Sequence, residues 1–100
     1  MKQHVLDIDS EQMEELNDTI NLMTSEDYIE RFVAEYRQTK IRYDKLKDFC
    51  NRIEAAEIMP EMVEKPVHDC PYSLLRDQQR AMGEYLRILE IRAIIEGIDL

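Results

Sequence analysis

The longest regular pattern of apolar positions in the chain runs from residue 29 to residue 53. Its members alternate spacings of three and four residues, and no glycine or proline interrupts them: Ile29, Phe32, Tyr36, Thr39, Tyr43, Leu46, Cys50 and Ile53. This heptad spacing predicts one helix over about residues 25–57 that packs along its length against a partner helix. Thr24 and Ser25 are predicted to cap its N-terminus.

Shorter patterns flank this segment. Before it, one narrow apolar stripe predicts a helix over about residues 10–23: Met13, Leu16, Ile20 and Met23. After it, residues 58–72 contain all three prolines and predict a connector. A third helix is predicted over about residues 73–96, and Gly97 is predicted to end it as a C-terminal cap.

The apolar residues of the third helix cover more than one face. They are Leu74, Leu75, Ala81, Met82, Tyr85, Leu86, Ile88, Leu89, Ile91, Ala93, Ile94 and Ile95. One face can pack on the long helix, and the other predicts contact with a neighbouring subunit, because a helix that is apolar on two faces needs two partners. We therefore expect an all-α fold, in which a short N-terminal helix precedes a long antiparallel αα-hairpin that oligomerises.

Composition agrees with this fold class. Two glycines and three prolines in 100 residues are too few for the many turns of a β-sandwich or barrel. The chain has 22 acidic and 13 basic residues, and residues 1–30 hold nine of the acids against a single base, Lys2. We therefore divide the chain into an acidic N-terminal extension, residues 1–23, and a hairpin domain, residues 24–100.

The sequence predicts a cytoplasmic protein. No run approaches 18 consecutive apolar residues, so no membrane span is expected. The N-terminal residues lack the apolar centre and the small-residue cleavage site of a secretory signal. Two cysteines do not make a disulfide framework, which favours a reducing compartment.

Motifs for catalysis and cofactor binding are missing from the sequence. There is no glycine-rich phosphate loop, nucleophile elbow or HExxH pattern, so we predict neither an enzyme nor a cofactor. Cys50, His68 and Cys70 are the nearest approach to a zinc ligand set, but a closed zinc site needs about four ligands. We therefore expect no metal, with Cys50 in the hairpin core and Cys70 in the connector.

Basic residues gather in one window of the long helix. Residues 37–47 contain five bases and one acid. At 100° per residue, Tyr36, Lys40, Tyr43 and Lys47 share one face. Aromatic rings between cations suit a small ligand that has flat bases and phosphates, because the rings stack on the bases and the cations neutralise the phosphates.

The third helix presents a similar row, Arg76, Arg80, Gly83 and Arg87, in which Gly83 would let a ligand or another backbone approach closely. We predict a binding site made of Tyr36, Lys40, Tyr43, Lys47, Arg76 and Arg80. The alternative is that the tyrosines are core residues whose hydroxyls reach the edge, with the cations lying over the hairpin contact. Five bases on so acidic a chain are too few for binding to duplex DNA.

The hairpin domain resembles small phage-encoded helical-hairpin proteins. The matching motifs are Tyr28-x-x-Arg31-x-x-x-Glu35, Tyr43-x-Lys45-Leu46-x-x-Phe49, Cys70-Pro71-x-x-Leu74-Leu75, Gln79-x-x-Met82-x-x-Tyr85 and Leu89-x-x-Arg92-x-x-x-Glu96-Gly97. The layout is also similar to the hairpin of anti-CBASS and anti-Thoeris sponges, with which it shares a Cys-Pro-x-Ser turn at residues 70–73. Those sponges place an arginine after that serine, where this chain has Leu74.

The resemblance implies a phage anti-defence protein of the host cytoplasm. Such sponges assemble into oligomers, often hexamers, and bind cyclic oligonucleotides or cyclised ADP-ribose signals at subunit interfaces without cleaving them. We expect this chain to form a homo-oligomer, from a dimer to a hexamer. Two other functions stay open. Residues 1–23 could mimic nucleic acid and inhibit a host enzyme as an acidic protein-binding arm. The chain could also be a structural or assembly helper.

Overall fold

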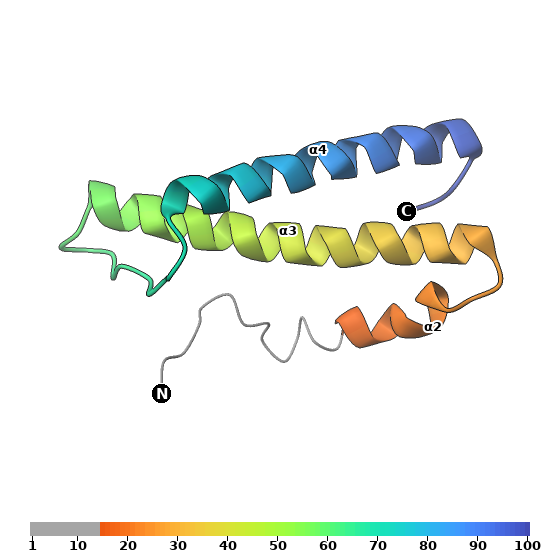
Figure 1. Ribbon diagram of the computed structural model, residues 1–100, viewed down its shortest axis with the longest axis horizontal. Coiled ribbons are helices and arrows are strands. Elements are labelled where there is room, and N and C mark those ends of the chain that lie inside the picture. Colours follow the sequence, from red (N-terminus) through yellow and green to blue (C-terminus); the bar gives the residue numbers. More distant parts are fainter. Residues whose placement is uncertain (1–14) are drawn as a thin grey trace.

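A computed structural model describes residues 15–100, which form an all-α fold (Figure 1). Two long helices, α3 (Tyr28–Ile58) and α4 (Tyr72–Glu96), run antiparallel and pack against each other as a hairpin. Residues 15–18 and the following short helix α2 (Ile20–Met23) lie along α3 on the side away from α4. The predicted short N-terminal helix and antiparallel hairpin are confirmed.

The heptad positions of α3 supply the hairpin core. Phe32, Leu46, Cys50 and Ile53 are each at most 5% exposed. They face a matching row on α4 whose buried members are Leu75, Leu86, Leu89 and Ala93. Most of the buried residues form two clusters, one toward each end of the hairpin, and the heptad positions between them, Tyr36, Thr39 and Tyr43, are only half-buried.

A second face of α3 is covered by the N-terminal segment. Ala34 is fully buried, although it lies outside the heptad row. One turn further along, the Gln38 Nε2 atom donates a hydrogen bond of 3.0 Å to the hydroxyl of Thr19, which is itself 1% exposed. The small side chain of Ala34 leaves room for this close approach.

The start of α3 differs from the sequence-based expectation. The helix begins at Tyr28, and its N-cap is Asp27, whose carboxylate accepts a hydrogen bond of 2.9 Å from the Ile29 N–H. The predicted cap, Ser25, instead accepts a hydrogen bond of 3.0 Å from the Asp27 N–H through its hydroxyl. The prediction was wrong because Asp27 reaches the unpaired N–H groups of the first turn better than residues further upstream.

Three apolar residues of the predicted stripes are exposed, among them Met23, which is 44% exposed. Ile20 is 52% exposed, because the helix breaks at Thr19 and turns that residue toward α3 instead. The Thr19 hydroxyl donates a hydrogen bond of 2.6 Å to the Leu16 carbonyl oxygen at this break. Ile29 is 49% exposed, whereas Ile98, which follows α4, packs in the cluster with Phe32 at that end of the hairpin.

The other predicted bounds agree closely with the structure. The connector covers residues 59–71. The predicted C-cap of the last helix is confirmed: Gly97 has φ 70°, in the left-handed region, and the Ile98 N–H donates a hydrogen bond of 2.8 Å to the Ala93 carbonyl oxygen. Residues 10–14 of the predicted first helix lie outside the described residues.

Tyrosine hydroxyls mark the register of the hairpin. The Tyr36 hydroxyl donates to Glu90 across the hairpin at 2.8 Å, and the Tyr72 hydroxyl donates to Glu54 at 2.8 Å. Eighteen residues forward along α3, from position 36 to position 54, therefore correspond to eighteen residues back along α4. In the same register Tyr43 lies opposite Gly83, with which it is in contact.

Candidate functional site

Three of the predicted site residues form a cluster on α3. The Nζ atoms of Lys40 and Lys47 lie 5.7 Å and 5.9 Å from the centre of the Tyr43 ring, one on each side along the helix. Lys40 also forms an ion pair with Asp44 at 2.8 Å. Among the described residues Lys47 has no acidic partner. We call Lys40, Tyr43 and Lys47 the basic-aromatic cluster.

The Tyr43 ring is held in place by a glycine of the opposite helix. A Cβ atom at Gly83 would lie 3.1 Å from Cε1 of Tyr43 and 3.4 Å from its hydroxyl oxygen. Gly83 therefore allows the Tyr43 ring of the same chain to pack closely against α4. The half-buried ring contacts Gly83 across the hairpin, which limits the entropy that the side chain would lose on binding a ligand.

Tyr36 lies one helical turn before the cluster and is half-buried. It packs against the core residues around Phe32 and Leu89, and its hydroxyl donates to Glu90. Burial, followed by this hydrogen bond, raises the pKa of Tyr36 to about 12. Tyr36 thus has the geometry of the alternative weighed from the sequence, a core aromatic residue whose hydroxyl reaches the edge.

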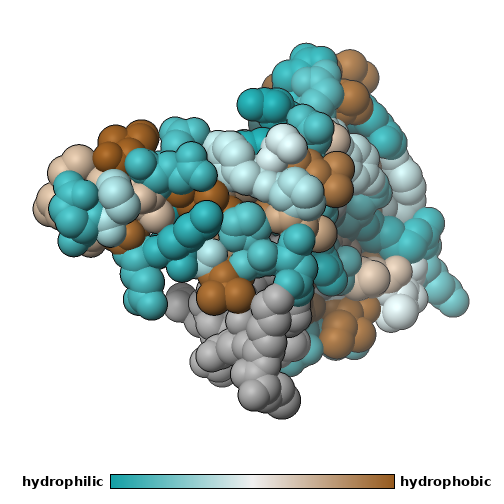
Figure 2. All heavy atoms as spheres, turned by 60° about the vertical axis from the view of Figure 1, so that its left-hand side comes forward, coloured by the Kyte–Doolittle hydropathy of each residue, from teal (hydrophilic) through white to brown (hydrophobic). Residues whose placement is uncertain are grey.

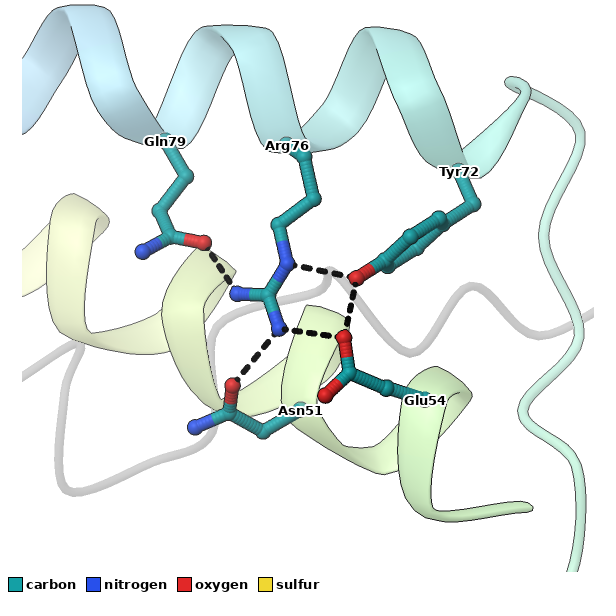
Figure 3. Close-up of polar contacts among 5 residues, drawn as sticks. All are labelled: Asn51, Glu54, Tyr72, Arg76 and Gln79. Atoms are coloured by element: carbon teal, nitrogen blue, oxygen red, sulfur yellow. Dashed lines mark hydrogen bonds and ion pairs between the residues drawn. The ribbon is translucent and has the colours of Figure 1, made fainter. Parts of the chain in front are cut away.

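Arg76 is enclosed in a polar network at the connector end of the hairpin (Figure 3). Its Nε donates to the Tyr72 hydroxyl at 2.7 Å, its Nη2 donates to Asn51 Oδ1 at 2.9 Å, and Nη1 donates to Gln79. Glu54 completes the network 3.6 Å from Nη2. The Arg76 side chain is only 15% exposed, and its donors are engaged both by residues of α4 itself, Tyr72 and Gln79, and by residues of α3.

Arg80 and Arg87 lie on the exposed side of α4. Arg80 pairs with Asp77 at 3.4 Å, and its side chain is 73% exposed. Arg87 forms two hydrogen bonds with Glu84, at 2.7 Å and 3.0 Å. The structure therefore separates the arginines that the sequence placed in one row: Arg76 lies inside the hairpin contact, whereas Arg80 remains accessible.

Two shallow grooves meet at Lys40. One, of about 160 Å³, lies between the long helices and is lined by Lys40, Tyr43, Gly83, Leu86, Arg87 and Glu90. The other, of about 230 Å³, lies between α3 and the N-terminal segment and is lined by Glu15, Asp18, Tyr36, Arg37, Lys40 and Ile41. Lys40 thus belongs to both, and acidic side chains border each groove.

The basic-aromatic cluster and the two grooves around it form the candidate site. Sequence reasoning found the residues of α3 and named Arg87 in the arginine row of the third helix. It missed the part played by Glu90, because only the register of the hairpin brings this carboxylate opposite Tyr36. A larger groove of about 510 Å³ lies in the connector between Arg52 and residues 62–67. It has no aromatic side chain to stack against a base.

The predicted metal candidates do not assemble into a site. In residues 15–100 no three His, Cys, Asp or Glu side chains are grouped so as to hold a metal ion. Cys50 is buried, and burial raises the pKa of its thiol, whereas Cys70 is exposed in the connector. No helix in the described part of the chain is long and apolar enough to cross a membrane.

A comparison with protein families now adds to this geometry. The Sequestin family model matches residues 26–95, which include α3, the connector and nearly all of α4. The chain belongs to the Sequestin family. Sequestins are phage proteins that sequester signalling molecules. Comparisons with curated proteins and with solved structures gave no match.

Membership of the Sequestin family covers the whole basic-aromatic cluster and its partners on α4, but not residues 15–23. A sequestering protein binds its ligand and does not convert it, which agrees with the prediction that the chain is not an enzyme. The coarse function, sequestration of a signal molecule, thus follows from the family.

Proposed function

We propose that this protein is a phage anti-defence protein that binds a cyclic nucleotide immune signal of the host and sequesters it without cleavage. The ligand class is a cyclic oligonucleotide or a cyclic ADP-ribose-type molecule, bound in the cytoplasm at an interface between subunits. The observation that carries the proposal is the basic-aromatic cluster, in which one fixed aromatic ring lies between two cations.

The chemistry of the cluster matches that of the ligand. A purine presents a flat face that can stack on the exposed part of the Tyr43 ring, and such stacking contributes about 1–3 kcal/mol per base. Lys40 and Lys47 lie on either side, where the phosphates that flank a base would be. Tyr36, about two turns before Tyr43, lines the groove beside the N-terminal segment, and Arg80 supplies a further accessible cation from α4.

The size of the grooves supports a site shared between subunits. Grooves of about 160 and 230 Å³ are smaller than the roughly 300–1,000 Å³ of ordinary small-molecule pockets. A single chain therefore encloses too little of a cyclic dinucleotide. A second subunit placed over the cluster would complete the site, as a symmetric oligomer does for a symmetric ligand.

Arg76 has a different part in this proposal. Its donors are engaged with Tyr72, Asn51 and Gln79, so it contributes positive potential near the cluster and holds α4 in register. The direct phosphate contacts in the proposed site come from Lys40, Lys47 and Arg80.

The decisive experiment is thermal unfolding of the purified protein against a panel of cyclic di- and trinucleotides and cyclic ADP-ribose isomers. A ligand at 100 times its Kd adds about 2.7 kcal/mol to the stability of the folded state. We expect one compound to raise the melting temperature by several degrees and to be recovered unchanged from the complex. A flat panel would contradict the proposal and favour the acidic protein-binding arm, residues 1–23.

A pair of matched variants tests the site. Lys40→Glu with Lys47→Glu reverses both cations of the cluster, and we expect it to abolish the thermal shift. Arg42→Glu with Lys45→Glu makes the same change of net charge on other faces of the same helix window, and it should retain most of the shift. Equal losses in both variants would mean that only overall charge matters, and the cluster would then not be the site.

A further inference from the structure

The N-terminal segment, residues 15–23, places two carboxylates beside the cations of the candidate site. Glu15 and Asp18 line the groove of about 230 Å³ together with Arg37 and Lys40 of α3. The segment contains no basic residue, and it lies outside the part of the chain that the Sequestin family model matches. It therefore adds negative charge to one wall of a groove whose other wall is positive.

Burial and a hydrogen bond fix the position of this segment on α3. Leu16 and Thr19 are 9% and 1% exposed, and the Thr19 hydroxyl accepts the hydrogen bond of 3.0 Å from Gln38. Glu15 and Asp18 each precede one of these buried residues, so the helical turn directs both carboxylates to the same side. Docking of the segment thus holds both carboxylates at the groove.

The two carboxylates are not used to hold the segment in place. Glu15 and Asp18 form no ion pair with another described residue. Lys40 pairs instead with Asp44 of its own helix at 2.8 Å, and Arg37 has no acidic partner within residues 15–100. Because the contacts that dock the segment do not involve these charges, their effect is on the electrostatic potential of the groove.

An anion that approaches Lys40 through this groove is repelled by both carboxylates. Charges on the opposite walls of so small a groove lie roughly within the Debye length, about 8 Å at physiological ionic strength, so salt screens their interaction only in part. The repulsion increases in proportion to the charge of the ligand, whereas stacking on an aromatic ring does not depend on that charge. The acidic wall therefore disfavours a highly charged anion more than a ligand with few charges.

We propose that Glu15 and Asp18 are specificity-determining residues, which exclude polyphosphates and other highly charged anions from the site and so favour ligands of low charge. A cyclic nucleotide fits this requirement, because each of its phosphates carries one negative charge. A terminal phosphate carries about −1.5 to −2, so nucleoside triphosphates and linear oligonucleotides with a terminal phosphate are rejected. The inference rests on the proposed function for the preferred ligand, but the exclusion of polyphosphate is a property of the groove alone.

The first test is isothermal titration calorimetry of the full chain with inorganic tripolyphosphate as the probe. Glu15→Gln with Asp18→Asn removes both charges and keeps the size of the side chains. At about 0.1 M ionic strength we expect this variant to bind tripolyphosphate about tenfold more tightly than the wild type. The ratio should approach one at about 1 M salt, where the Debye length is about 3 Å. Equal binding, or no binding by either protein at low salt, overturns the proposal.

Glu57→Gln with Glu61→Gln is the matched control. Both residues are exposed at the connector end of the hairpin, which comes forward in Figure 2, and neither lines the groove. The control makes the same change of net charge and should bind tripolyphosphate as the wild type does. Equal gains in both variants would show that net charge alone decides the affinity, and the proposal would then be wrong.

A third variant locates the probe. Adding Lys40→Glu to the Glu15→Gln, Asp18→Asn protein should remove the gain in tripolyphosphate binding, because the groove then loses the cation that attracts the anion. A gain that survives this change would place the anion elsewhere on the chain and overturn the proposal.

The last test separates this proposal from the proposed function. A cyclic dinucleotide has about half the charge of tripolyphosphate, so its affinity should rise only about threefold in the Glu15→Gln, Asp18→Asn protein. A gain as large as that of tripolyphosphate would show that the carboxylates do not discriminate by charge, and would overturn the proposal. If no cyclic nucleotide binds and the tripolyphosphate gain is observed, the proposed function fails while the exclusion of polyphosphate stands.

Discussion

Arg76 and Arg80 lie one helical turn apart on α4, and replacing each by alanine should have very different effects on stability. The Arg76 guanidinium donates to Tyr72, Asn51 and Gln79 and is 15% exposed, whereas the Arg80 side chain is 73% exposed with one partner, Asp77. Arg76→Ala removes the contacts of the guanidinium with Asn51 and Glu54, which connect α4 to α3.

The expected loss of unfolding free energy depends on how many hydrogen bonds are removed and on how many of their partners can bond to water instead. Hydrogen bonds to a charged group contribute about 1.5–3 kcal/mol each when they are buried. Asn51 and Glu54 are exposed and regain water when the arginine is removed, so we expect a net loss of about 2–3 kcal/mol rather than the full sum. For a domain of this size such a loss lowers the melting temperature by roughly 10–20 °C.

Chemical denaturation followed by circular dichroism at a fixed protein concentration measures the difference. Arg80→Ala is the control, and as a surface substitution it should change the free energy of unfolding by no more than about 0.5 kcal/mol. Arg76→Lys should lie between the two, because an ammonium cannot bridge three acceptors in a plane. Equal stabilities for Arg76→Ala and Arg80→Ala would refute the assignment of Arg76 to the hairpin contact.

Two further variants test the tyrosines. The pKa of Tyr36 is raised to about 12, so the folded state keeps a proton that the unfolded state loses above pH 10. Between pH 10 and pH 12 the unfolding free energy of the wild type should therefore fall by about 1–2 kcal/mol more than that of Tyr36→Phe. Parallel curves of unfolding free energy against pH would contradict this prediction. Gly83→Ala should stabilise α4 by up to about 1 kcal/mol in a Tyr43→Ala background. When Tyr43 is present, the same substitution should stabilise α4 less or not at all, because the new methyl group meets the tyrosine ring. A double-mutant cycle without coupling between the two positions would show that they do not touch.

Local patterns in the sequence were enough for the helices and their core. Phe32, Leu46, Cys50 and Ile53 are buried where the heptad spacing put them, and Gly97 ends α4 as predicted. Helical phase depends only on residues that are near in sequence, so it can be read without knowledge of the partner. The cap of α3 was misplaced by two residues or more because several side chains near residue 25 can accept the same N–H groups.

The basic-aromatic face was also a local prediction. Lys40, Tyr43 and Lys47 are three or four residues apart on one helix, and the structure brings the two Nζ atoms within 6 Å of the ring centre. Whether the face binds a nucleotide depends on the ligand and on what surrounds the face in the complex, and neither is encoded in the spacing of these residues.

Tertiary structure decided what each of these side chains faces. The antiparallel register sets Tyr36 against Glu90 and Tyr43 against Gly83, and it encloses Arg76 between helices while Arg80 stays in water. A shift of one turn along the hairpin would keep the heptad pattern and change all of these contacts. The sequence by itself therefore determined the helices and their buried faces, whereas the residues that meet across the hairpin depended on a register that only long-range packing sets.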